Sequence, residues 1–280
     1  MVYADLHVHT DASDGLLSLE EVVEEVRKQD VKAVALTDHD TINPGLEDRY
    51  QVMNTVEVVT GAEVKAVHRG VEIEILCYFL DPEDNELNEL FEEMNKKRLG
   101  RMKKMVERFN SLKDGVRLDM KDVVGLSKGS VGRPHFVRAI MEKGLEENFW
   151  DAFDKYASKD SKFFVPLEKP DAGEVIERAG ESGVLTSLAH PCKEDIDDFE
   201  KFIKSLEKIG LDGCEVDYSY HRNKGDLKLE PNKVKEIVES FGLMKTGGSD
   251  FHDRKNFVLG GCGISRENFM EMKKAAEFYD

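Results

Sequence analysis

The sequence predicts an α/β fold with a parallel sheet or barrel, interrupted by a mainly helical insertion. Three observations support this prediction. Short apolar runs of strand length alternate with amphipathic stretches of helix length toward both ends of the chain. A segment near the middle breaks the alternation and has only helical patterns. The 280 residues, 40% hydrophobic and 35% charged, have the balance of a globular protein with enough chain for a large core.

The first eighty residues contain four strand-like runs and one well-marked helix. Ser18 has the features of a helix N-cap, because Glu21 follows three residues later and apolar residues recur at helical spacing from Leu19 to Val26. The strands are predicted at 2–8, 31–37, 56–60 and 71–80. Strands alternating with helices in this way are typical of a parallel sheet or barrel.

The middle of the chain, residues 81–170, breaks this rhythm. Its helical patterns lie at 83–110, 133–143 and 146–156. Beyond it the alternation resumes, with strands at 184–189, 213–216 and 243–246 and helices at 195–208 and 232–240. We therefore predict one α/β domain formed by residues 1–80 and 171–280, with 81–170 as a helical insertion. The basic residues of the insertion suit either a solvated helix face or a cap over an anionic substrate.

Composition and charge exclude several classes of protein. The chain carries 40 Lys and Arg against 57 Asp and Glu, a net charge of −17. A protein that holds long nucleic acid by bulk electrostatics needs a basic surface, so we expect no such partner. A small anionic substrate is compatible with this charge if metal ions reverse the local field. No apolar run approaches the ~20 residues of a membrane span, so no membrane partner is expected.

The chain start and the cysteines indicate a cytoplasmic location. Residues 1–5 show no basic region and no cleavage site of a secretory signal. The four cysteines form no C-x-x-C pair and are expected to be reduced thiols that act as small buried hydrophobes. They are Cys77, Cys192, Cys214 and Cys262.

Histidines and acidic residues recur at or just beyond the carboxyl ends of the predicted strands. His7 and His9 end the first strand, and their i, i+2 spacing puts both imidazoles on one face, where they can reach one ion. The others are Asp14, Asp38, His39, Asp40, Glu63, His190, Asp250 and His252. In parallel α/β folds these strand ends face one shared mouth, where active sites form. Because five of the eight histidines belong to this set, we expect a metal-dependent active site.

The order of these motifs resembles that of the PHP (polymerase and histidinol phosphatase) superfamily. The motifs are D-L-H-V-H-T at 5–10, S-D-G at 13–15, L-T-D-H-D at 36–40, G-A-E at 61–63, A-H-P at 189–191 and G-S-D-F-H at 248–252. G-R-P-H-F at 132–136 resembles the insertion of the nucleotide-phosphatase branch, which includes 3′,5′-nucleotide bisphosphatases and RNase AM proteins of the TrpH/YciV type. The resemblance implies a distorted (β/α)7 barrel holding two or three divalent ions, with manganese favoured over iron or zinc.

Carried over position by position, the resemblance implies three metal-binding sets. The first is His7, His9, Glu63 and Asp250, the second shares Glu63 and takes His190, and the third is Asp14, His39 and His252. Glu74, in E-I-L-C at 74–77, stands where the family has a metal-binding histidine. A carboxylate there would still bind a metal and would favour harder ions such as manganese, iron or magnesium. The alternative is a weak or absent second metal.

The implied reaction is hydrolysis of a phosphate monoester of a small nucleotide, either a 3′,5′-bisphosphate or a 5′-monophosphate. Clustered divalent ions suit it because they generate hydroxide from water and neutralise charge in the transition state. A metal-activated hydroxide would attack phosphorus, with His190 and Asp250 as catalytic residues. Arg133, His135 and Lys162 are the candidates for substrate binding, although Arg133 on pattern alone fits a solvated side chain at a helix start.

Three other functions stay open on the sequence. A 5′→3′ exonuclease on short RNA or DNA ends needs only the metals and a few basic residues of the insertion. A metal-binding regulatory module without turnover would follow if Glu74 silences the site. Histidinol-phosphate hydrolysis, another activity of the family, is disfavoured by the G-R-P-H-F stretch.

Overall fold

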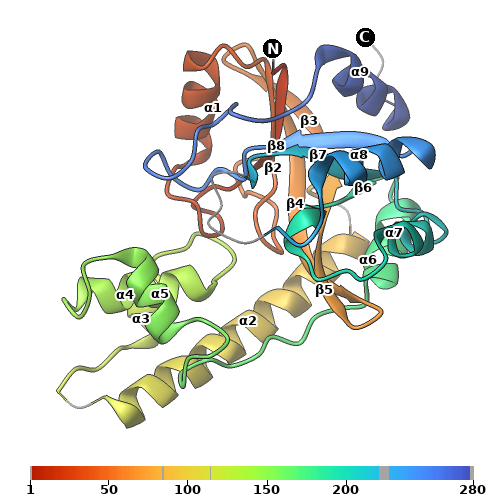
Figure 1. Ribbon diagram of the computed structural model, residues 1–280. Helices are drawn as coiled ribbons and strands as arrows, with labels where there is room; N and C mark the ends of the chain where they lie inside the picture. The colour runs from red at the N-terminus through yellow and green to blue at the C-terminus, as the bar shows by residue number, and fades with distance from the viewer. Residues whose placement is uncertain (1, 84, 114, 221–226, 278–280) are drawn as a thin grey trace.

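The computed structural model describes residues 2–83, 85–113, 115–220 and 227–277, and within them seven strands form a nearly closed barrel with helices around it (Figure 1). The described sheet has eight strands, the seven of the barrel and β3: β1 (Ala4–Val8), β2 (Ala33–Leu36), β3 (Tyr50–Met53), β4 (Val56–His68), β5 (Val71–Tyr78), β6 (Leu185–Leu188), β7 (Gly213–Tyr218) and β8 (Met244–Gly248). Hydrogen-bonded neighbours follow the order β1-β2-β4-β5-β6-β7-β8, and β3 pairs with β4 off this path. The predicted distorted (β/α)7 barrel is confirmed.

The distortion of the barrel lies at β5, which runs antiparallel to both of its neighbours, β4 and β6. A two-residue turn joins β4 to β5, and its residues Arg69 and Gly70 have φ of 50° and 82°. Positive φ at both positions is what a tight hairpin turn of this kind requires. The strand predicted at 56–60 was too short, because residues 61–68 continue β4 as the partner of β5. Glu63 therefore lies inside a strand and not after it.

The barrel closes between β1 and β8, beside the first pair of histidines. The backbone N–H of His9 donates to the Phe251 carbonyl at 2.9 Å. Gly248, the last residue of β8, lies so close to His7 that an added Cβ would come within 2.4 Å of the Cβ of His7. Only glycine fits at this distance, so Gly248 allows the ends of the two strands to approach.

Helices cover the barrel, and several of them follow one another in the sequence between β5 and β6 (Figure 1). They are α1 (Leu19–Lys28), α2 (Asn85–Leu112), α3 (Met120–Val124), α4 (Arg133–Glu142), α5 (Phe149–Tyr156), α6 (Ala172–Glu181), the 3-10 turn η1 (Pro191–Lys193), α7 (Phe199–Glu207), α8 (Pro231–Ser240) and α9 (Arg266–Ala275). The predicted cap of α1 is confirmed, because Ser18 Oγ accepts from the Glu21 N–H and the Glu21 carboxylate accepts from the Ser18 N–H. The sequence did not predict α6, which contains the weak helix formers Gly173 and Gly180.

The long helix α2 contributes to two hydrophobic cores. Its first half buries Leu87, Leu90, Phe91 and Met94 in the core that packs on the barrel. Its second half buries Met102, Met105, Val106 and Phe109 with residues of α4 and α5. Between the halves, Arg98 Nε donates to Asp40 Oδ2 at 2.6 Å and ties the helix to the loop after β2. Figure 1 shows α2 extending beyond the barrel, with α3, α4 and α5 gathered along its outer part.

Two further features concern the helices and the cysteines. Within the described part of the chain, no helix is both long and apolar enough to cross a membrane. All four cysteines are free, and burial raises the pKa of the Cys77 thiol to about 12, so this thiol is unreactive near neutral pH.

Candidate active site

The side chains of the first predicted metal-binding set meet in a buried cluster at one end of the barrel. His7 and His9 come from the end of β1, Glu63 from β4, and Asp250 from the loop after β8. His7 Nε2 lies 3.3 Å from Glu63 Oε1 and 3.5 Å from Asp250 Oδ1. His9 Nε2 lies 3.4 Å from Glu63 Oε2 and 3.3 Å from Asp250 Oδ1. Four donors from three separate parts of the sequence therefore surround one small volume.

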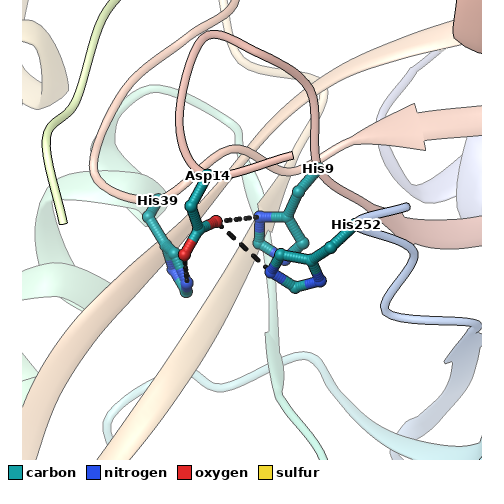
Figure 2. A group of neighbouring side chains, drawn as sticks. All are labelled: His9, Asp14, His39 and His252. Carbon is teal, nitrogen blue, oxygen red and sulfur yellow. Dashed lines mark ion pairs between the residues drawn. The ribbon is translucent and has the colours of Figure 1, made fainter. Parts of the chain in front are cut away.

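A second group, formed by His9, Asp14, His39 and His252, shares His9 with the first (Figure 2). The Asp14 carboxylate faces all three imidazoles. Its Oδ1 lies 3.3 Å from His252 Nε2 and 3.9 Å from His9 Nδ1, and its Oδ2 lies 3.8 Å from His39 Nε2. The structure brings together the three residues of the third predicted set and adds His9 to them.

Glu74 joins the cluster through His190. His190 Nε2 lies 3.2 Å from Glu63 Oε1 and 3.0 Å from Glu74 Oε2. The other carboxylate oxygen of Glu74 makes an ion pair with the ammonium of Lys65. Glu74 thus faces the predicted second metal set with one oxygen and a lysine with the other.

The donor atoms of these groups fit bound cations. Several of them are buried and have no hydrogen-bond partner of good geometry among the described residues. They are His7 Nε2, both ring nitrogens of His9, Asp14 Oδ1, His39 Nδ1 and His190 Nδ1. A buried polar atom without a partner costs about 1–3 kcal/mol, so such a concentration of them in one place needs an explanation. Coordination of divalent ions supplies it, because imidazole and carboxylate are ordinary ligands of such ions.

The electrostatics of the cluster give His9 and Glu63 metal-binding protonation states. Burial, followed by the charge of His252, lowers the pKa of His9 to about 3, so His9 is neutral at neutral pH and its nitrogen lone pairs are available. Burial alone would raise the pKa of Glu63, but the charges of His39 and His7 outweigh it and hold that pKa well below the usual range. Metal ligands must be deprotonated, and both residues meet this condition. For His7 and His252, burial alone would lower the pKa, but neighbouring carboxylates outweigh it and raise the pKa, to about 9 for His252.

The cluster opens onto a cavity of about 680 Å³. Asp14, His39, Asp250 and His252 line it, together with nine lysine and arginine side chains counted within the described residues. Six of these nine belong to residues 81–170. The same described lining holds four acidic residues, Asp14, Glu72, Asp250 and Asp253, so basic side chains exceed acidic ones nine to four. A chain with a net charge of −17 therefore presents a cavity with an excess of basic groups, which favours an anionic ligand.

Arg133 is the only one of the three predicted substrate-binding residues found among the described lining of this cavity. Its guanidinium carbon lies 5.0 Å from the ring centroid of Phe153, and its Nη1 donates to the Ala157 carbonyl at 3.1 Å. These contacts hold the guanidinium in a fixed position at the start of α4.

His135 and Lys162 lie elsewhere. His135 is buried, with Nδ1 accepting from the Gly132 N–H at 2.9 Å and Nε2 donating to the Ser13 carbonyl at 2.7 Å. It therefore ties α4 to the loop that carries Asp14. Lys162 is exposed, with its ammonium 5.1 Å from the ring centroid of Phe163.

Comparison with known proteins identifies the family. The sequence profile of the PHP domain matches residues 5–165, more than half of the chain. The chain belongs to the PHP family. It is a metal-dependent phosphoesterase and thus a hydrolase, as the sequence predicted. The non-catalytic module considered from the sequence finds no support in these comparisons.

Three relatives illustrate the similarity. A 5′-3′ exoribonuclease of Haemophilus influenzae is 30% identical over 253 residues, which cover 89% of both chains. A 3′,5′-nucleoside bisphosphate phosphatase of Chromobacterium violaceum is 24% identical over 265 residues, which cover 90% of this chain and 88% of the relative. A crystal structure from Bifidobacterium adolescentis, of a protein inferred to be a metal-dependent phosphoesterase, is 26% identical with a TM-score of 0.83, covering 97% of this chain and 96% of that one.

Glu215 supports the PHP site although the sequence did not predict it. It is fully buried on β7, and its Oε1 lies 3.2 Å from His7 Nδ1. Its Oε2 accepts from the backbone N–H of His190 at 2.8 Å. Because Glu215 engages Nδ1 of His7, Nε2 of the same ring faces Glu63 and Asp250. Carboxylates commonly orient metal-ligating histidines in this way. The available signal was an acidic residue inside the short apolar strand G-C-E-V at 213–216.

Other acidic residues of the PHP motifs hold the loops of the site. Asp38 accepts from the hydroxyls of Thr10 and Ser13, each at 2.6 Å, and so fixes the turn that leads to Asp14. Asp5 accepts from the Ser249 hydroxyl at 2.6 Å beside Asp250. Both residues lie in motifs that the sequence marked, but their role is to position the loops.

Two residues of the cluster are among the described non-glycine residues with a positive φ. His190 and Asp250 have φ of 26° and 54°, in the left-handed region that non-glycine residues rarely adopt. Such conformations persist where the surroundings enforce them, and they cluster at functional sites.

Proposed function

We propose that the chain hydrolyses a phosphate monoester of a small nucleotide, either a 3′,5′-bisphosphate or a 5′-monophosphate. The observation that carries this proposal is the shared cavity, since imidazoles and carboxylates of the cluster line the same space as nine basic side chains of the described residues. The Chromobacterium violaceum relative, named as a 3′,5′-nucleoside bisphosphate phosphatase, supports it.

Two or three divalent ions would be held by the groups around Glu63, Asp14 and His190. The donors found within the described residues are imidazole nitrogens and carboxylate oxygens, a set that suits manganese, iron or zinc, and manganese is the proposed metal. Glu74 would be a ligand beside His190. Bound ions of this kind lower the pKa of water and neutralise charge on a phosphate group.

The chain's own residues would bind and orient the substrate. Lys193 lines the cavity, with its ammonium 3.3 Å from Asp250 Oδ2 and in contact with the Tyr218 hydroxyl, so it is placed to bind a phosphate oxygen next to the cluster. Arg133 offers a planar fork for a second phosphate. His190 and Asp250 are the proposed catalytic residues, because both belong to the cluster on which the reacting phosphate would lie.

Residues 81–170 would serve as a substrate cap on a barrel formed by 1–80 and 171–280. The lining of the cavity supports this part of the proposal, because six of the nine basic lining residues found in the described chain belong to residues 81–170. The free cysteines are consistent with the cytoplasmic location that we propose.

The first test is phosphate release from adenosine 3′,5′-bisphosphate by the manganese-loaded protein. Metal-stripped protein and the Asp250→Asn variant are the controls, and both should lose the activity. Arg133→Ala should raise KM for the bisphosphate more than for adenosine 5′-monophosphate, because only the bisphosphate carries the second phosphate that Arg133 would bind. No release from either nucleotide would contradict the proposal, and equal effects of Arg133→Ala on both would contradict the assignment of Arg133.

A 5′→3′ exonuclease acting on short RNA or DNA ends is the second candidate. The 30% identical Haemophilus influenzae relative, named as a 5′-3′ exoribonuclease, favours it. Salt dependence separates the two activities, because polymer binding releases counterions and weakens steeply with salt, whereas a small substrate responds far less. Preferential degradation of a 5′-phosphorylated oligonucleotide, with a steep salt dependence, would establish the second candidate over the first.

A further inference from the structure

Three aromatic side chains of α5 line the cavity that contains the metal-binding cluster. They are Phe149, Trp150 and Phe153. The ring centroids of Phe149 and Trp150 lie 5.2 Å apart, and those of Trp150 and Phe153 lie 6.4 Å apart, so the three rings form one contact group. Trp150 is nevertheless 49% exposed. A large indole that is half exposed at the wall of a cavity is available to a ligand in that cavity.

Positive charge surrounds this aromatic group. The guanidinium carbon of Arg133 lies 5.0 Å from the Phe153 centroid, and that of Arg138 lies 5.9 Å from the Phe149 centroid. Both arginines line the cavity. Aromatic faces next to cationic groups are the combination that binds nucleotides, because the bases stack on the rings and the phosphates pair with the cations.

The barrel adds a further ring to the same cavity. Phe257, in the loop after β8, lines it, and its ring centroid lies 5.3 Å from that of His252 in the metal-binding cluster. The lining thus continues from the metal-binding imidazoles to aromatic side chains of both the barrel and the insertion. A ligand in this space can contact the cluster with one end and the rings with the other.

We propose that Trp150, supported by Phe149 and Phe153, forms a nucleobase subsite of this cavity. Its ligand is a nucleotide whose base stacks on the indole while a phosphate lies at the metal-binding cluster. The inference rests on the proposed function and narrows its range of substrates to nucleotides. A phosphate ester without a base, such as a sugar phosphate, would leave the subsite unused. Stacking uses the π-face that every base has, so the subsite accepts all four bases.

Tryptophan fluorescence tests the subsite directly. Trp150 is the single tryptophan of the chain, so the emission reports on this position alone. In stopped-flow titrations of the metal-loaded protein, adenosine 5′-monophosphate should change the emission in a saturable way, and ribose 5-phosphate should bind about tenfold more weakly. Equal affinities for the two ligands, or an emission that adenosine 5′-monophosphate leaves unchanged, would overturn the proposal.

Variants give an independent readout. Trp150→Ala should raise KM for adenosine 5′-monophosphate about tenfold and leave KM for ribose 5-phosphate unchanged, since only the first ligand stacks. Trp150→Phe keeps an aromatic face and should restore most of the affinity. Asp154→Ala, at an exposed position of the same helix that is not among the described lining residues, is the matched control. Equal KM changes for both substrates in Trp150→Ala would indicate a structural role and overturn the proposal.

The two proposals fail in different ways. If neither compound is hydrolysed but the emission still distinguishes them, the nucleobase subsite stands and the phosphatase activity falls. If both are hydrolysed, with the same ratio of kcat/KM in the wild type and in Trp150→Ala, the phosphatase stands and the subsite falls.

Discussion

Replacing Glu215 by glutamine tests whether the unpredicted carboxylate controls the metal site. Glu215 accepts two N–H groups at once, with 3.2 Å between Oε1 and His7 Nδ1 and 2.8 Å between Oε2 and the His190 nitrogen. Glutamine has nearly the same shape but only one carbonyl oxygen. One of the two donors must therefore face the amide NH₂, and either the His7 ring or the strained backbone of His190 loses its support.

The size of the effect follows from these contacts. Glu215 is fully buried, so water cannot replace the lost acceptor. A hydrogen bond to a charged group contributes about 1.5–3 kcal/mol, so the free energy of unfolding of the metal-free protein should fall by about 2 kcal/mol. Loss of an outer-shell partner of a metal-ligating histidine typically lowers metal affinity about 10- to 100-fold, and we expect Glu215→Gln to lie in this range.

The assay is a competition titration of manganese against a chelator, combined with urea unfolding of the metal-free protein. Glu236→Gln, at an exposed position on α8, is the matched control and should change neither quantity. A folded Glu215→Gln protein with the manganese affinity of the wild type would refute the reasoning, because the contacts of Glu215 would then contribute nothing to the ligand geometry.

Three further predictions concern the metals, Glu74 and Glu57. Manganese at a hundred times its Kd should stabilise the fold by about 2.7 kcal/mol, seen as a higher Tm that a chelator reverses, and an unchanged Tm would contradict the fit of the buried donors to metal ions. Glu74→Gln should lower the number of manganese ions bound per chain, measured by elemental analysis, because it removes a charged ligand and leaves Lys65 beside the cluster; unchanged stoichiometry would exclude Glu74 as a ligand. Burial alone would raise the pKa of Glu57, but hydrogen bonds from Tyr3 and neighbouring groups, Lys273 among them, outweigh it and lower the pKa. The unfolded state therefore binds more protons than the folded state near about pH 4. In urea unfolding, the wild type should be more stable than Glu57→Gln above that pH, and the difference in the free energy of unfolding should shrink below it. A difference that does not vary with pH would contradict this prediction.

The convergence of the site could be predicted because it depends on patterns that are local in sequence. Because His7 and His9 are two residues apart, both imidazoles project from the same face of a strand. The positions of Asp14 and His39 after two successive strands of an alternating pattern place them at the same end of the barrel. In each case a short motif and a general rule of α/β folds determine the location without any knowledge of side-chain contacts.

The roles of His135 and Glu215 were not predicted from the sequence, because they depend on contacts across the fold. His135 lies in a motif that suggested substrate binding, but both its ring nitrogens are engaged, with the Gly132 N–H and the Ser13 carbonyl. The motif at 132–136 does not predict this contact, because Ser13 is 122 residues away in the sequence. Glu215 likewise acquires its role only when β7 brings it beside His7. Local patterns locate a side chain on its element, and the partners of that side chain come from tertiary packing.

Glu74, which stands where the family pattern has a histidine, lies opposite Lys65 because β5 runs antiparallel to β4. On a parallel sheet these two positions would have no fixed relation, but in the antiparallel ladder Lys65 and Glu74 are directly opposite, so their side chains share one face. Glu63, two residues before Lys65 on β4, lies on that face as well. A histidine at position 74 would leave the Lys65 ammonium beside the imidazoles of the cluster without its counter-charge. The glutamate therefore does two things that a histidine cannot do together, because it offers one oxygen to the cluster and neutralises the lysine with the other.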